Sequence, residues 1–261
     1  MRFPDSIERL IKGKAYKNDG IGMSSSSVLI FDDCVLKISP AGKDCSKTAD
    51  VMRWLDGKLP VPKVLCCESD AENSYLLMSR VRGRMTCDEY WMERPDALVK
   101  GLADALRMLW SVDTAGCPRI RDMDEEIRQA RYIVENGLAD TGNVEPTTYG
   151  EGGFRDPADL LSWLEDNRPD YDPVMSHGDF CLPNIFMEDG EITGFIDLDM
   201  AGVGDRWRDI ALCYRSLRWN SEGAYGGKVY PDIRSMKLFD ELGIEPDMEK
   251  IRYYLLLDEL F

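Results

Sequence analysis

The spacing of apolar residues changes near residue 80 from a strand-like to a helix-like pattern. Before that point, short runs of β-branched and other apolar residues alternate with turn residues such as the Asp32-Asp33 pair. These runs predict strands over residues 28–31, 34–38, 63–67 and 74–78. One helix is expected among the strands, over residues 43–55, because Gly57 and Pro60 follow it as stop signals.

Beyond residue 80 the apolar residues recur three and four positions apart, which is the spacing of one helix face. The pattern is clearest behind Pro95, where Leu98, Leu102 and Leu109 fall on one face. Further helices are predicted over residues 122–134, 156–166, 206–217, 230–242 and 246–258. We therefore expect an α+β chain with a small β-rich lobe, residues 1–80, and a larger helical lobe, residues 81–261.

Charge narrows the class of partner. The chain of 261 residues has 32 Lys and Arg against 48 Asp and Glu, a net charge of −16. Such a balance repels nucleic acid and anionic membranes and attracts small polycations. Because many proteins are acidic only for solubility, charge alone does not choose between a cationic ligand and a solvated surface.

The cysteines and the single histidine argue against a metal centre built from sulfur and nitrogen. Eight cysteines are scattered without a C-x-x-C pair, and His177 is the only histidine. A zinc site and a disulfide scaffold are therefore not expected. The first residues lack an apolar signal core and no run approaches a membrane span, so we expect a cytoplasmic protein.

Residues 176–184, Ser-His-Gly-Asp-Phe-Cys-Leu-Pro-Asn, carry the strongest chemical signal. Phosphoryl transfer needs a carboxylate that orients the attacking hydroxyl, and oxygen ligands that hold Mg²⁺ against the nucleotide phosphates. In protein kinases the catalytic Asp and a metal-binding Asn stand five positions apart, and a second metal-binding Asp follows in the next hairpin. Asp179, Asn184 and Asp197 have this order and spacing. The motif therefore predicts a kinase-type site.

Other interpretations of the same residues are weaker. An isolated Asp or Asn in a loop usually serves as a turn or cap residue, so only the combination favours a site. A Ser-His-Asp hydrolase site made of Ser176, His177 and Asp179 is excluded, because side chains adjacent in sequence do not converge on one point.

A small-residue loop and a lysine precede the motif in the order that a kinase requires. Residues 20–27, Gly-Ile-Gly-Met-Ser-Ser-Ser-Ser, allow backbone N–H groups and hydroxyls to approach phosphate oxygens. This loop is neither a complete G-x-G-x-x-G nor a Walker A sequence. Lys37 follows near the end of the next predicted strand, where kinases place the lysine that pairs with the nucleotide phosphates.

Several stretches spread over almost the whole chain point to one family. They are residues 22–24, 54–65, 76–79, 111–113, 117–118, 176–179, 184–186, 194–198 and 257–261. In this combination the chain resembles the aminoglycoside 3′-phosphotransferases, antibiotic-resistance kinases that share the protein-kinase fold. The resemblance implies a two-lobed fold in which residues 1–80 bind ATP and residues 81–261 provide the catalytic and substrate-binding groups.

The resemblance also implies roles for the matching residues around the nucleotide. Asp179 would be the catalytic base, with Asn184 and Asp197 as the Mg²⁺ ligands. The ATP contacts would come from the Ser24 and Lys37 side chains at the phosphates and from the backbone of Ser79 and Val81 at the adenine edge.

For the substrate, the resemblance implies a polycationic aminoglycoside whose ammonium groups are neutralised by acidic groups. Besides Asp179, these would be Glu145, Glu151, Glu259 and the α-carboxylate of Phe261. Glu145 and Glu151 lie in an acidic insert where a solvated loop is the alternative.

Some positions depart from the family pattern near the nucleotide. The helix glutamate that should pair with Lys37 falls at Thr48, so Asp44 or Asp50 is expected to replace it. The aromatic residue that stacks on adenine falls at Val35, so apolar packing should replace stacking.

Other departures fall in the expected substrate cleft. An acidic position of the family falls at Leu182 and an arginine position at Met200, while Asp199 adds a carboxylate beside Asp197. These differences bear on which drugs are accepted rather than on nucleotide chemistry.

The sequence therefore predicts Mg²⁺-dependent transfer of the ATP γ-phosphate to the 3′-hydroxyl of aminoglycosides, a kanamycin-kinase type of activity that confers resistance. Two alternatives are a kinase of the same fold acting on another small alcohol and a degenerate kinase-like binding module. The second is motivated by Thr48 in place of the helix glutamate.

Overall fold

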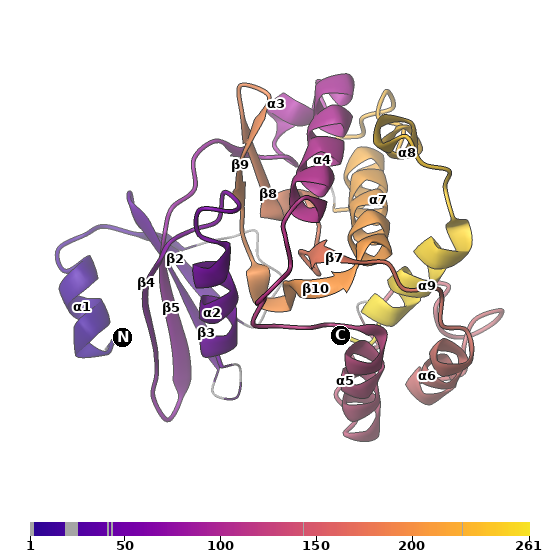
Figure 1. Ribbon diagram of the computed structural model, residues 1–261, viewed down its shortest axis with the longest axis horizontal. Helices are drawn as coiled ribbons and strands as arrows, with labels where there is room; N and C mark the ends of the chain where they lie inside the picture. The colour runs from indigo at the N-terminus through magenta and orange to yellow at the C-terminus, as the bar shows by residue number, and fades with distance from the viewer. Residues whose placement is uncertain (1–2, 19–25, 41, 43, 143, 226) are drawn as a thin grey trace.

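The first part of the chain folds into an antiparallel five-stranded sheet with strand order β1-β2-β3-β5-β4 (Figure 1). The computed structural model describes residues 3–18, 26–40, 42, 44–142, 144–225 and 227–261. The strands of this sheet are β1 (Lys17–Asn18), β2 (Ser27–Ile30), β3 (Cys34–Pro40), β4 (Val64–Ser69) and β5 (Asn73–Ser79). Two helices accompany it, α1 (Asp5–Ile11) and α2 (Ser46–Leu55).

Both faces of this sheet are covered, because successive strand residues point to opposite sides. On one face Leu36 and Leu77 pack with Ile7 of α1 in a small separate core. On the other face Leu76 and Met52 of α2 belong to the large core that extends into the rest of the molecule. Helix α2 therefore lies between the sheet and the helical region, and α1 lies on the outer side (Figure 1).

The chain beyond β5 is mainly helical. Its helices are α3 (Glu89–Met92), α4 (Pro95–Trp110), α5 (Met123–Glu135), α6 (Pro157–Asp166), α7 (Arg206–Glu222), α8 (Lys237–Leu242) and α9 (Met248–Asp258). Its strands are β6 (Arg84–Met85), β7 (Pro173–Ser176), β8 (Ile185–Glu188), β9 (Glu191–Phe195) and β10 (Gly202–Asp205), with short 3₁₀ turns η1 (Leu182–Asn184) and η2 (Leu198–Met200). Along the described chain, no helix combines the length and the apolar character needed to cross a bilayer.

Two small sheets inside this helical region position the loops of the site. Strand β7 pairs antiparallel with β10, and β8 and β9 form a hairpin that β6 extends. The buried face of α4, with Leu98, Leu102 and Leu109 fully inaccessible, packs in the same core as β7 and β8. The loops after β7 and β9 are therefore supported by a rigid, apolar base.

The α+β fold class expected from the sequence is confirmed, with differences in detail. The predicted strands and most predicted helices are present. The helix expected over 230–242 is wrong in its first half, because α8 begins at Lys237. The Tyr230 N–H donates to the Ser221 carbonyl at the end of α7 (2.8 Å), and a turn follows in which the Ile233 N–H donates to the Tyr230 carbonyl (3.1 Å).

Helix starts follow the acidic residues that the sequence marks. The carboxylates of Asp156 and Asp205 accept hydrogen bonds from the backbone N–H groups of Asp159 (2.9 Å) and Trp207 (2.8 Å). Such caps satisfy donors that the first helical turn leaves without partners. At the other end, α8 stops at Gly243, whose φ of +68° is costly for any other residue.

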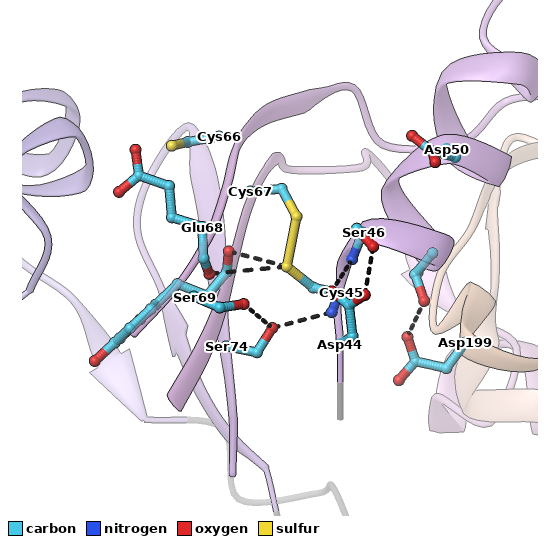
Figure 2. The surroundings of a disulfide bond; sticks show 12 residues. Asp44, Cys45, Ser46, Asp50, Cys66, Cys67, Glu68, Ser69, Ser74 and Asp199 are labelled. Carbon is cyan, nitrogen blue, oxygen red and sulfur yellow. Dashed lines mark hydrogen bonds between the residues drawn. A yellow bond between two sulfur atoms is a disulfide. The ribbon is translucent and has the colours of Figure 1, made fainter. Parts of the chain in front are cut away.

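One disulfide is present, a pairing that the sequence did not predict. Cys45, which immediately precedes α2, is bonded to Cys67 of β4, with 6.5 Å between their Cα atoms (Figure 2). The Cys45 N–H also donates to the Ser74 hydroxyl of β5 (3.0 Å). The other six cysteines are free. The pairing joins positions 22 residues apart that only the packing of α2 on the sheet brings together, so their spacing carries no signal for it.

Candidate active site

A cavity of about 760 Å³ lies between the five-stranded sheet and the helical region. Apolar side chains from the sheet, among them Val28, Val35 and Met78, line one side. The same cavity is lined by six of the site residues predicted from the sequence, namely Lys37, Ser79, Val81, Asp179, Asn184 and Asp197. These residues come from distant parts of the chain, and the fold brings them together around one space. Ser24 lies outside the described residues.

The loop that carries Asp179 is fixed from beneath by Asp209 of α7. This carboxylate is fully inaccessible to solvent and accepts hydrogen bonds from the backbone N–H groups of His177 (2.8 Å) and Gly178 (2.9 Å). Burial raises the pKa of Asp209 above its ordinary value, while the His177 side chain and the two N–H donors act in the opposite direction. From the neighbouring position, the Arg208 guanidinium donates to the Gly178 carbonyl (2.8 Å).

Gly178 is required by the geometry of this loop. Its φ is +79°, and a Cβ added there would lie 2.2 Å from the carbonyl oxygen of Met200. Both the backbone conformation and the close approach exclude a side chain. The Gly178 position therefore brings the loop of Asp179 directly against the segment that follows Asp197.

His177 joins the same two segments and has a structural role. Its Nε2 lies 2.9 Å from the Ile196 carbonyl, which can only accept, so Nε2 carries the proton. The other ring nitrogen, Nδ1, accepts from the Asp179 N–H (3.3 Å). Because the ring is fully buried, it orients Asp179 and the residue before Asp197 without facing the cavity.

The five-residue spacing of Asp179 and Asn184 closes a hydrogen-bonded ring. The Asn184 amide nitrogen donates to the Asp179 carbonyl (3.0 Å) and to one Asp179 carboxylate oxygen (2.9 Å). The Cys181 thiol donates to the other carboxylate oxygen (3.1 Å), and burial raises the pKa of this thiol so that it stays protonated. One donor on each carboxylate oxygen fixes the orientation of the Asp179 side chain.

Lys37 of β3 spans the cavity and pairs with two carboxylates. Its Nζ lies 2.6 Å from Asp197 and 2.7 Å from Asp199. Burial lowers the pKa of Lys37, but the two carboxylates more than offset that effect and hold it above its ordinary value. Asp197 itself has a φ of +57°, an uncommon backbone conformation that turns its side chain into the site.

The expectation that Asp44 or Asp50 anchors Lys37 is wrong. Asp44 accepts from the Ser46 N–H (2.9 Å), and Asp50 pairs with Arg53 (3.1 Å) on the exposed side of α2. Figure 2 shows Asp50 on the helix well away from Asp199. Asp44 lies just before α2 and Asp50 lies in it, whereas the fold supplies the carboxylate from η2.

Two further expectations are refined around the cavity. The Ser79 N–H already donates to the Lys63 carbonyl (2.8 Å), so it is engaged within the protein. Leu182 is wrong as a cleft residue, because it is fully buried with the Ser216 hydroxyl on its N–H (3.0 Å) and the Thr86 hydroxyl on its carbonyl (2.8 Å).

The acidic residues expected to bind a drug divide into two groups. Glu259 accepts from the Glu145 N–H (3.1 Å), so these two residues lie together. Arg215 lies 3.7 Å from Glu259 and Arg218 lies 3.5 Å from Glu145. Glu151 is exposed in a turn. As far as the described chain extends, the residues lining the 760 Å³ cavity do not include Glu145, Glu151, Glu259 or Phe261.

Glu145, Glu259 and the neighbouring Phe261 form an acidic cluster, and Arg208 links it to the loop of Asp179. Besides its bond to Gly178, its guanidinium lies 3.3 Å from Asp258 and 5.5 Å from the centre of the Phe261 ring. Asp258 is also paired with Arg215. Arg208 and Asp209 were not predicted from the sequence, although two charged residues within the apolar repeat of α7 are the kind of signal that marks a buried polar contact.

Burial raises the pKa of Glu259 to about 7, although Arg215 acts against this shift. The carboxyl therefore changes charge in the neutral range, and a nearby cation would favour its ionised form.

Comparison with known proteins agrees with this geometry. A sequence profile described as the phosphotransferase enzyme family matches residues 17–239. The chain is 37% identical to an aminoglycoside 3′-phosphotransferase of Enterococcus faecalis, over 100% of this chain and 99% of that protein. It is 36% identical to the corresponding enzyme of Staphylococcus aureus, again over 100% and 99%.

A solved structure supports the same assignment. The crystal structure of an aminoglycoside 3′-phosphotransferase of type VIII superposes with a TM-score of 0.79 at 26% identity, covering 98% of each chain. Similarity over the full length, in sequence and in fold, shows that this chain belongs to the aminoglycoside 3′-phosphotransferase family.

Proposed function

We propose that this protein transfers the γ-phosphate of ATP to the 3′-hydroxyl of aminoglycoside antibiotics and thereby confers resistance to them. The observation that carries the proposal is the convergence of Lys37, Asp179, Asn184 and Asp197 on one cavity. The family relationship supplies the reaction class, a phosphotransferase with an alcohol acceptor.

Asp179 is the proposed catalytic base. Its carboxylate is oriented by the Asn184 amide and the Cys181 thiol and faces the cavity. A carboxylate in this position orients the attacking hydroxyl and accepts its proton as the bond to phosphorus forms. Most of the rate acceleration then comes from holding the acceptor and the phosphate in line.

Asn184 and Asp197 are the proposed ligands of Mg²⁺. Their donor atoms fit this ion, because Mg²⁺ prefers hard oxygen ligands and keeps only one or two from the protein. The Asn184 amide nitrogen donates a hydrogen bond to Asp179, which leaves the amide oxygen for a metal. When bound, the ion would neutralise charge on the nucleotide phosphates.

The nucleotide is proposed to lie under the five-stranded sheet. Val28, Val35 and Met78 would pack on the adenine ring, with Val81 and the Ser79 backbone at its edge. A phosphate contact by Ser24 is proposed from the sequence alone. In this arrangement residues 1–80 form the nucleotide-binding lobe and residues 81–261 the catalytic and substrate-binding lobe. Use of ATP is consistent with a cytoplasmic location.

The aminoglycoside is proposed to bind between Asp179 and the acidic cluster of Glu145, Glu259 and Phe261, with Glu151 at the rim. Arg208 links that cluster to the loop of Asp179. The net charge of −16 favours the approach of a polycation. Charge-assisted hydrogen bonds from ammonium groups to these carboxylates are stronger than neutral ones. The alternative of a degenerate binding module was based on the lack of a helix glutamate at Thr48. Lys37 has a carboxylate partner in Asp199 instead, so that argument no longer applies.

Turnover with aminoglycosides tests the proposal. In a coupled ATP assay, 2-deoxystreptamine drugs with a 3′-hydroxyl should be phosphorylated, whereas 3′-deoxy analogues should not. Asp179→Ala should lower kcat by about 10²-fold or more while nucleotide affinity is retained. Asp166→Ala, an exposed acid at the end of α6, serves as the control and should match the wild type. An Asp179→Ala enzyme with more than about a tenth of wild-type kcat would exclude the role of base.

The pH dependence of drug binding tests the acidic cluster. With a pKa of about 7, Glu259 is mostly neutral at pH 6 and mostly ionised at pH 8, so raising the pH adds a negative charge to the cluster. At saturating ATP, the KM for the drug should therefore be several-fold higher at pH 6 than at pH 7.5. Glu259→Gln should give a high KM with a flatter profile. Parallel profiles in the two enzymes would remove Glu259 from the site.

A further inference from the structure

We propose that Asp199, held by Thr48, is the residue that positions Lys37 for the nucleotide phosphates. This inference rests on the proposed function, since it assigns a role within the ATP site. Kinases generally hold the strand lysine with a glutamate from the neighbouring helix. Here the helix supplies a hydroxyl and the carboxylate comes from η2 in the other lobe.

The contacts use both oxygens of the Asp199 carboxylate. One oxygen lies 2.7 Å from Lys37 Nζ, and the other accepts a hydrogen bond from the Thr48 hydroxyl at 2.9 Å. A carboxylate fixed at both oxygens has little rotational freedom, so it presents a defined acceptor to the lysine. Figure 2 shows the Asp199 carboxylate directed at a side chain of α2, which is Thr48.

The backbone of Asp199 is fixed as well. Arg119 donates to the Asp199 carbonyl (2.6 Å) and to the Ala201 carbonyl (3.2 Å). These bonds hold the short η2 turn through its backbone. Asp199 is therefore oriented through its main chain and its side chain by residues from two separate segments.

Burial explains why a threonine at position 48 is significant. Thr48 is 5% exposed, and its hydroxyl donates to Asp199 at 2.9 Å. The Lys37 side chain is 13% exposed, so its ammonium group also depends on protein carboxylates for compensation. A buried polar group without a partner is costly, and the Lys37, Asp199 and Thr48 contacts satisfy one another.

Asp197 cannot hold Lys37 in position alone if it binds a metal. Both Asp197 and Asp199 contact Lys37, but only Asp199 is also held by α2. A carboxylate that ligates a cation shares its charge with that cation, which weakens its hold on a lysine. Asp199 would keep Lys37 in place whether or not Asp197 binds a metal. It is a positioning residue because it acts through Lys37.

Binding of the non-hydrolysable analogue AMP-PNP with Mg²⁺, measured by calorimetry beside steady-state kinetics, tests this assignment. Asp199→Asn should weaken binding of the analogue and raise the KM for ATP by about tenfold, since hydrogen bonds to charged groups contribute at that level. The KM for the aminoglycoside should change little. Thr48→Val should give a smaller change in the same direction, and Thr48→Ser should restore wild-type values because it keeps the hydroxyl.

The control and the double variant separate positioning from general damage. Asp50 lies on the same helix as Thr48, and its carboxylate pairs with the exposed Arg53, so Asp50→Asn should leave these parameters unchanged. Adding Thr48→Val to Asp199→Asn should cause little further loss of analogue affinity, because the two changes act on the same interaction. Thermal melts establish that each variant is folded at the assay temperature.

Three results would overturn the assignment. The first is unchanged affinity of folded Asp199→Asn for the analogue, and the second is additive losses of affinity in the double variant. The third is an altered Mg²⁺ requirement of Asp199→Asn at unchanged nucleotide affinity, which would make Asp199 a metal ligand. If the wild type binds AMP-PNP but phosphorylates no aminoglycoside, the proposed substrate fails, while the binding series still decides the role of Asp199.

Discussion

The rest of the site depends on the two hydrogen bonds that the buried carboxylate of Asp209 accepts from the backbone of the Asp179 loop. By accepting from two consecutive backbone N–H groups, this carboxylate fixes the loop at His177 and Gly178 before the chain reaches Asp179. The absence of a side chain at Gly178 then allows the loop to touch the segment after Asp197. Because Asp209 belongs to the long helix α7, the position of Asp179 is tied to the main core rather than to a free loop.

Ion pairs connect the two parts of the molecule across the cavity. Lys37 belongs to the sheet, whereas its partners Asp197 and Asp199 follow the β9 strand of the helical region. A second group of charges, centred on Arg208 and Arg215, joins the last helix to the loop of Asp179. In a chain with a net charge of −16, these few buried cations hold carboxylates close together that would otherwise repel one another.

Most of the polar residues that line the cavity were predicted from the sequence, whereas most of the residues that hold them in place were not. Asp179, Asn184 and Asp197 were identifiable because kinase chemistry fixes their spacing along one stretch of chain. The partner of Lys37 was not, because Asp199 meets it only through tertiary packing, and local spacing pointed to acids on α2. The same limit applies to the disulfide at Cys45, which depends on how the helix docks on the sheet. Alternation and helical periodicity gave the fold class, since both reflect local burial.

The position of the transferred phosphate tests the account most directly. Kanamycin incubated with the enzyme and Mg²⁺-ATP can be purified and analysed by ³¹P and ¹H NMR. The account predicts one phosphate monoester whose phosphorus couples to the proton at carbon 3′ of the aminosugar ring. A phosphorus coupled to any other ring proton, or recovery of unmodified drug from folded enzyme that binds nucleotide, would contradict it.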